Sequence, residues 1–375
     1  MVMRLARSIV GEREVEAVSR VLLEDGYLGM GKEVKAFEEE IAAYLGVPAS
    51  HVACVNSGTA AVHLAVAAAV EPGDEVLVQS LTYVATYQAI TAAGAVPVAC
   101  EVQADTVTLD LADAARRLTP RCKAVMPVHY ASFPEGLDEV YQFAATHGLR
   151  VIEDAAHAFG CTCRGRRIGS FGDVACFSFD GIKNITSGEG GAVVSTDEAL
   201  LARVRDARLL GVENDTEKRF CGQRSWEFDV HRPGYRYHMS NVFAAIGRTQ
   251  LARLDSEFAP RRIALARQYR RRLGPVPGIA LLRTDLGPVV PHLMPVRVLD
   301  GRRDELSAAL NREGMQCGIH YKPNHLLSLF GGGAVRLPVT ERLYQELLSL
   351  PLHPGLSDAD VDAVCEAIIR FFRER

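Results

Sequence analysis

The feature that most constrains the fold is a regular alternation of short apolar runs and helical patterns between residues 52 and 153. We expect strands at 52–55, 75–79, 96–100, 123–128 and 149–153, with helices at 60–70, 110–118 and 136–147. Strands that are joined one after another by helices lie parallel in a single sheet, and the helices cover both of its faces. The sequence therefore predicts an α/β fold with a largely parallel sheet.

A second region indicates where the chemistry lies. Apolar runs at 174–177 and 192–194 flank a turn that carries Lys183. A lysine has a pKa near ~10.4, so it is a poor nucleophile unless its surroundings or an imine removes the charge. The strand at 149–153 leads directly into Asp154, which places a carboxylate where open α/β sheets bind ligands. The pair suggests pyridoxal phosphate, with Lys183 forming the Schiff base and Asp154 facing the pyridinium nitrogen. The alternatives are a surface lysine and a helix cap.

Two further turns follow predicted strands. The turn at 56–60, which contains Gly58 and Thr59, opens a helix whose free N–H groups and positive dipole end suit a phosphate. A plain Ser/Thr helix cap is the alternative. Tyr83 starts a helix after the strand at 75–79, where its ring could stack on a flat cofactor or simply pack against its neighbours.

Composition excludes several classes of protein. The chain has 375 residues, 48% of them hydrophobic and 23% charged, and a formal net charge of −4, so no basic field invites nucleic acid. The nine cysteines are scattered and form no CxxC pair, which favours reduced thiols in a cytoplasmic protein and no metal site. We expect no secretory signal and no membrane segment, since no apolar run approaches the length of a membrane span.

The C-terminal third alternates less regularly. A long helical pattern runs from about 241 to 272, and we place a domain boundary inside it, near Phe258. Residues 1–258 are then a large α/β domain with an N-terminal helix, and residues 259–375 a smaller α+β domain. In the smaller domain we expect strands at 293–298 and 317–321 and helices at 302–313, 339–349 and 357–373.

Seven segments of the chain carry a resemblance to a known family. They are Val55–Ala61, Pro72–Val76, Pro127–Tyr130, Ile152–His157, Ser178–Gly191, Gly234–Met239 and Ile319–His325. In this order they resemble the DegT/StrS sugar aminotransferases, over almost the whole chain. The resemblance implies the aspartate-aminotransferase-like fold (PLP fold type I) and a homodimer with shared active sites. It also implies pyridoxal phosphate and transfer of an amino group from an amino acid, usually glutamate, to a keto sugar that is usually nucleotide-linked.

The resemblance also assigns residues to the cofactor. They are Gly58, Thr59 and Ser178 at the phosphate, Tyr83 and His157 at the ring, Asp154 at the ring nitrogen and Lys183 at the Schiff base. Many family members have asparagine and arginine where this chain has Arg236 and His238, in a segment that reaches the neighbouring subunit. We expect Arg236 to bind the partner's cofactor phosphate or a substrate. His320 and His325 are candidate sugar contacts, and a structural role is as plausible for each.

Three other functions stay open at this point. A dehydratase subclass uses the same cofactor but has histidine in place of the lysine, so Lys183 argues against it. An aminotransferase could act on a free cyclic ketone such as an inosose, or on a keto acid sugar. A non-enzymatic regulatory protein on this scaffold should lack the lysine or carry an added DNA-binding module, and neither feature is present in the sequence.

Overall fold

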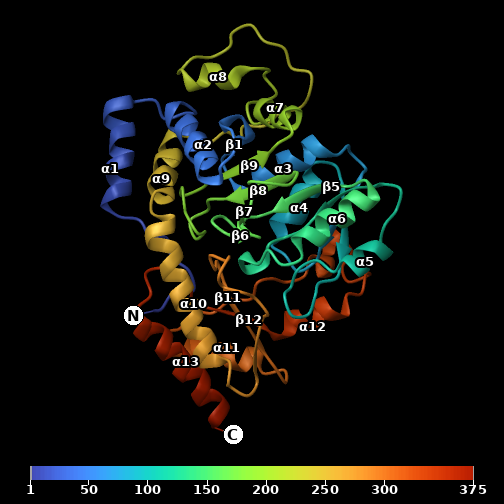
Figure 1. Ribbon diagram of the computed structural model, residues 1–375, viewed down its shortest axis with the longest axis vertical. Coiled ribbons are helices and arrows are strands. Elements are labelled where there is room, and N and C mark those ends of the chain that lie inside the picture. The colour runs from blue at the N-terminus through green and yellow to red at the C-terminus, as the bar shows by residue number, and fades with distance from the viewer. Residues whose placement is uncertain (1, 375) are drawn as a thin grey trace.

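The computed structural model describes residues 2–374 (Figure 1). Its strands are β1 (Val52–Val55), β2 (Glu75–Gln79), β3 (Val96–Cys100), β4 (Cys122–Met126), β5 (Arg150–Asp154), β6 (Thr162–Cys163), β7 (Arg166–Arg167), β8 (Val174–Ser178), β9 (Gly191–Ser195), β10 (Ile279–Leu281), β11 (Met294–Val298) and β12 (Leu347–Leu350). Its helices are α1 (Glu12–Arg20), α2 (Lys32–Leu45), α3 (Gly58–Ala69), α4 (Val84–Ala92), α5 (Leu111–Arg116), α6 (Leu137–His147), α7 (Glu198–Ala207), α8 (Asp215–Phe220), α9 (Asn241–Leu251), α10 (Ala259–Leu273), α11 (Arg303–Arg312), α12 (Pro338–Glu346) and α13 (Asp358–Arg373). Within residues 2–374, no helix combines the length and apolar character needed to cross a bilayer.

Seven strands form the main sheet, in the order β1-β9-β8-β5-β4-β2-β3. The pairs from β8 to β3 are parallel, and only β9 runs against both of its neighbours. The predicted α/β class with a largely parallel sheet is confirmed. The turn that connects β8 to β9 contains no helix to cross over the sheet, so β9 returns beside β8 and pairs with it in the antiparallel direction. That turn carries Lys183.

Strand β8 shows how the sheet buries both faces. Val174 and Cys176 belong to a core cluster that includes much of α3, whereas Ala175 and Phe177 belong to a second cluster that includes α2 and α9. This separation follows from the two-residue period of a strand. Because both faces are covered, every residue of β8 is buried, and each large apolar side chain contributes about 1.5–3 kcal/mol by leaving water.

A second, antiparallel sheet of β10, β11 and β12 packs with α10, α11 and α13 in the lower part of the molecule (Figure 1). The N-terminus lies here too, because Met3 pairs with Met315 and the Leu5 carbonyl accepts a hydrogen bond from Leu352 N at 3.0 Å. The N-terminal segment therefore runs from the second sheet up to α1, which packs against α9 beside the main sheet. The division into 1–258 and 259–375 stays a prediction.

Two elements of the C-terminal third were predicted wrongly. Residues 317–321 form no strand, and only Gly318 pairs with the edge of β12, at Ser349. Beyond Gly318 the chain leaves the sheet toward the site described below. The helix expected at 339–349 ends at Glu346, and Leu347 turns the chain into β12 instead. Leucines at helical spacing continue into β12, so the apolar pattern alone does not separate the two elements.

The long helical pattern at 241–272 is interrupted. Helix α9 ends at Leu251 and α10 begins at Ala259, and a π-helical turn at Leu254–Phe258 lies between them. Figure 1 shows the two helices running on from one another between the main sheet and the lower part of the molecule. The first turn of α10 therefore lies close to both parts.

Candidate active site

A cavity of about 400 Å³ lies at the carboxyl ends of β5 and β8. The predicted site residues that line it are Gly58, Thr59, Tyr83, Asp154, His157, Ser178, Lys183 and His320. Segments that are far apart in sequence thus meet at one edge of the sheet, as expected for a parallel α/β fold. Arg236 and His325 are the predicted residues that do not line it.

One side of the cavity is the N-terminus of α3. Ser57 caps this helix by accepting a hydrogen bond from Ala60 N at 3.0 Å. The first N–H groups of a helix, here those of Gly58 and Thr59, have no partner within the helix. A Cβ at Gly58 would lie 2.6 Å from Cβ of Ser178, so only glycine allows this approach. Free N–H groups beside a serine hydroxyl form a cradle suited to a phosphate.

Asp154 ends β5, and its carboxylate is fixed in orientation. Thr86 Oγ1 donates to Oδ2 at 2.7 Å, and Ala156 N donates to Oδ1 at 3.2 Å. Thr86 in turn contacts the Thr82 hydroxyl at 3.0 Å. Sequence reasoning missed Thr86, although the spacing of Thr82 and Thr86 places both hydroxyls on one side of a helix start. The hydroxyl of Thr86 therefore fixes the orientation of the Asp154 carboxylate at the cavity.

Lys183 sits in the turn between β8 and β9, enclosed by protein but with part of its side chain open to the cavity. Burial lowers the pKa of Lys183, and the nearby carboxylates of Asp154 and Asp180 oppose that shift. A lowered pKa increases the neutral fraction of the amine, which is the form that attacks a carbonyl or takes a proton.

Histidines and tyrosines form the opposite wall. Nε2 of His157 lies 3.1 Å from the Tyr321 hydroxyl, and its ring lies 4.4 Å from that of His292. Burial, and then the charge of Lys183, lower the pKa of His157 well below its usual value. The same causes lower the pKa of His320 to about 4. These imidazoles are therefore neutral near pH 7.

Sequence reasoning also missed Tyr321 and His292. Tyr321 lay within a segment quoted for the family resemblance, so a signal for it existed, whereas nothing in the sequence singled out His292. Tyr83 precedes α4 as predicted, is 56% exposed, and has its ring centroid 5.4 Å from that of Tyr321. An exposed aromatic at the mouth of the cavity fits the proposed stacking position.

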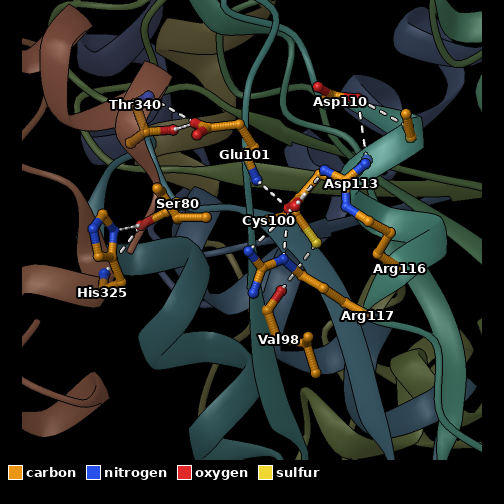
Figure 2. Close-up of polar contacts among 12 residues, drawn as sticks. Ser80, Val98, Cys100, Glu101, Asp110, Asp113, Arg116, Arg117, His325 and Thr340 are labelled. Carbon is orange, nitrogen blue, oxygen red and sulfur yellow. Dashed lines mark hydrogen bonds and ion pairs between the residues drawn. The ribbon is translucent and has the colours of Figure 1, made fainter. Parts of the chain in front are cut away.

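His325 and Arg236 lie elsewhere. His325 is fully buried, with Nδ1 2.7 Å from the Ser80 hydroxyl, next to the contact between Glu101 and Thr340 (Figure 2). This placement fits the structural alternative for His325 rather than a sugar contact. Arg236 is exposed, and its backbone carbonyl accepts a hydrogen bond from Asn56 at 3.3 Å. Its side chain does not line the cavity of its own chain.

The residues present fit pyridoxal phosphate. The glycine–serine cradle suits the phosphate, the carboxylate at the end of β5 suits the ring nitrogen, and the cavity contains one lysine. Nδ1 of His157 is buried without a hydrogen-bond partner among the described residues, which leaves a polar atom available beside the cavity. Between residues 2 and 374, His, Cys, Asp and Glu side chains form no cluster able to hold a metal ion.

Comparison with known proteins agrees with this chemistry. The spore coat polysaccharide biosynthesis protein SpsC of Bacillus subtilis is 37% identical over 371 residues, which cover 96% of this chain and 94% of that protein. The aminotransferase TlmJ of Streptoalloteichus hindustanus matches with a TM-score of 0.91 and 34% identity, over 99% of this chain and 98% of its own. The PLP form of the sugar aminotransferase Spr1654 of Streptococcus pneumoniae matches with a TM-score of 0.91 and 27% identity, over 100% and 99%.

The family itself is identified by sequence. A profile of the DegT/DnrJ/EryC1/StrS aminotransferase family matches residues 8–369. These similarities confirm the predicted fold and cofactor. They also confirm that the chain is an enzyme and not the non-enzymatic regulatory protein considered as an alternative. The chain therefore belongs to the DegT/DnrJ/EryC1/StrS family and is a pyridoxal phosphate-dependent aminotransferase.

Proposed function

We propose that this enzyme transfers an amino group from an amino acid, with glutamate as the donor, to a nucleotide-linked keto sugar. The observation that carries the proposal is the convergence of Lys183, Asp154 and the Gly58–Ser178 cradle on one cavity. The sugar as acceptor is supported by relatives whose names refer to polysaccharide biosynthesis and to sugar aminotransferases. The cytoplasmic location expected from the cysteines stays a prediction.

We assign the cofactor contacts as follows. Gly58, Thr59 and Ser178 hold the phosphate, Asp154 pairs with the ring nitrogen, and Tyr83 and His157 lie along the ring. When bound, pyridoxal phosphate supplies the electron sink that stabilises loss of the donor's α-proton and carries the amino group between the half-reactions.

Lys183 is the catalytic residue in this proposal. Its Nζ would hold the cofactor covalently at rest and would be free to move a proton once the donor is bound. The free amine then takes the α-proton of the donor, and in the second half-reaction it delivers a proton to the sugar carbon that receives nitrogen. Burial of Lys183 supports this role, because it lowers the pKa and favours the neutral amine that must accept the proton.

A second copy of the chain is needed to complete the site. Among residues 2–374, those lining the cavity include no arginine, although the donor carboxylate and a nucleotide phosphate are both anions. Arg236 is exposed and follows a Pro-Gly turn. We propose that it reaches the partner's site in a homodimer and binds the cofactor phosphate or the substrate there. His320 is a candidate sugar contact from the cavity wall.

A panel assay tests the acceptor. Purified enzyme is incubated with glutamate and either nucleotide-linked keto sugars, inososes or keto acid sugars, and aminated products are measured by mass spectrometry. We expect amination of a nucleotide-linked keto sugar. Amination confined to inososes or keto acid sugars would favour the alternative acceptors. Failure of every acceptor, with glutamate conversion intact, would remove the sugar assignment but keep the transaminase.

A further inference from the structure

Arg262 is a buried cation with an unusual set of partners. It lies in the first turn of α10 and is 2% exposed. Its Nη1 donates to the carbonyl oxygens of Pro291 at 3.2 Å, His292 at 3.4 Å and Leu352 at 3.4 Å. No carboxylate within residues 2–374 forms an ion pair with it, and burial lowers the pKa of Arg262 to about 10. The guanidinium is therefore still charged at neutral pH and is balanced only by backbone dipoles.

These carbonyls connect Arg262 to the turn that carries the lysine. Its Nη2 faces the carbonyl oxygen of Lys183 at 3.5 Å. The next residue, Asn184, donates from Nδ2 to the carbonyls of Val290 at 3.0 Å and Phe159 at 3.1 Å. The consecutive carbonyls of residues 290–292 are thus bound by Asn184 from the lysine turn and by Arg262 from α10.

The same segment supports the imidazole wall of the cavity. The His292 ring packs against that of His157 at 4.4 Å. His292 N donates to the Ser132 hydroxyl at 2.9 Å, and that hydroxyl donates to the His157 carbonyl. Any shift of residues 290–292 therefore moves the support of His157 together with the backbone of Lys183.

We propose that Arg262 is a positioning residue, which holds Lys183 and the His157 wall in a fixed relation through residues 290–292. The inference rests on the assignment of Lys183 as catalytic lysine. Burying a charge without a counter-ion is costly, and an apolar side chain of similar length would fill the same space without that cost. The guanidinium spreads five N–H groups over three nitrogens in a rigid fork, so it can reach the carbonyl of Lys183 and those of residues 291, 292 and 352 together. The three N–H groups of lysine all lie on one nitrogen, and methionine has none.

Positioning matters here because Lys183 has to move a proton between defined atoms. A displacement of about 1 Å at a reacting group can cost on the order of a hundredfold in rate. If Arg262 served stability alone, its substitution would not change the reaction rate of the protein that remains folded.

Arg262→Met and Arg262→Lys test the proposal, with Arg303→Met as the matched control. Arg303 is also buried and also donates to backbone carbonyls, at Tyr344 (2.9 Å) and Leu347 (3.4 Å). Unlike Arg262, it pairs with a carboxylate, that of Asp304 at 2.5 Å, and these partners lie outside the turn that carries Lys183. Each protein is measured for cofactor content, apoenzyme Tm and single-turnover rate with donor. The pH midpoint for acylation of Lys183 in the apoenzyme is followed on its peptide by mass spectrometry.

We expect Arg262→Met to lower the single-turnover rate by about 10- to 100-fold at equal cofactor content, and Arg262→Lys by less. The acylation midpoint of Lys183 should rise, because a loosened turn exposes the amine to water. Arg303→Met should lower Tm while its rate stays within about threefold. Asn184→Ala removes the hydrogen bonds to the carbonyls of Phe159 and Val290 and should lower the rate as the Arg262 variants do. It provides the test if neither Arg262 variant folds.

Folded Arg262 or Asn184 variants with wild-type rates and an unchanged acylation midpoint would overturn the proposal. Arg262 would then only stabilise the fold. Borohydride reduction of the wild-type holoenzyme separates the two assignments. Label on Lys183 with normal variants refutes the role of Arg262 alone, whereas label on another lysine refutes the role of Lys183 itself.

Discussion

Acid should destabilise this enzyme through His320. Nδ1 of this partly buried residue lies 2.8 Å from the Ser349 hydroxyl, and burial together with Lys183 lowers its pKa to about 4. In the unfolded chain a histidine has a pKa near ~6.5. The unfolded state therefore binds a proton first as the pH falls. Stability is complete above pH ~6.5, is lost progressively between pH ~6.5 and ~4, and stays lost below that window.

The size of the effect follows from the two pKa values. At pH 5 the difference corresponds to about 2 kcal/mol of lost folding free energy from His320 alone. A chain of 375 residues has an unfolding entropy of roughly 0.8 kcal/mol/K, so the loss lowers Tm by about 2.5 °C. His157 and His292, whose pKa values are also lowered by burial, add further loss in the same direction.

Thermal unfolding of the apoenzyme at pH 7.5 and pH 5, with and without His320→Asn, measures this contribution. Asparagine can still contact Ser349 but does not titrate. The variant should lose about 2.5 °C less than the wild type between the two pH values, because His157 and His292 still titrate in both proteins. An identical pH dependence in the two proteins would refute the reasoning.

Three other experiments test the site. Gly58→Ala places a Cβ 2.6 Å from Ser178 Cβ and should weaken cofactor affinity at least tenfold in a spectroscopic titration, whereas wild-type affinity would contradict the cradle. Asp154→Asn should keep cofactor content but lower turnover by on the order of a hundredfold, and near-normal turnover would give Asp154 another role. Arg236→Ala mixed with Lys183→Ala should regain activity, because a mixed dimer has one intact site if Arg236 acts across the interface. No recovery, with mixed dimers demonstrated, would restrict Arg236 to its own subunit or to no site.

The main sheet and the polar ends of its strands could be predicted from local sequence. Strand–helix alternation predicts parallel pairing, and parallel pairing predicts that Asp154 and the turn with Lys183 share one edge. Those two inferences need only periodicity and chain direction. For this reason the cavity contains most of the residues that the sequence singled out.

The remaining features depend on contacts that local patterns do not encode. Leu347–Leu350 is a strand because β11 lies beside it, although its leucines continue a helical pattern. Residues 317–321 have the composition of a strand, yet only Gly318 finds a partner on the edge of β12. Nothing in the local sequence distinguishes Arg262 from the other arginines of α10, because its four carbonyl partners come from residues 183, 291, 292 and 352.

The identity of the lysine that binds the cofactor is the most direct test of the account. The holoenzyme is reduced with borohydride and digested, and the peptide that carries the pyridoxyl group is identified by mass spectrometry. We expect the label on Lys183, which lines the same cavity as Gly58, Ser178 and Asp154 and whose pKa is lowered by burial. Label on another lysine, or reduction without any labelled peptide from a yellow protein, would contradict the site proposed for this enzyme.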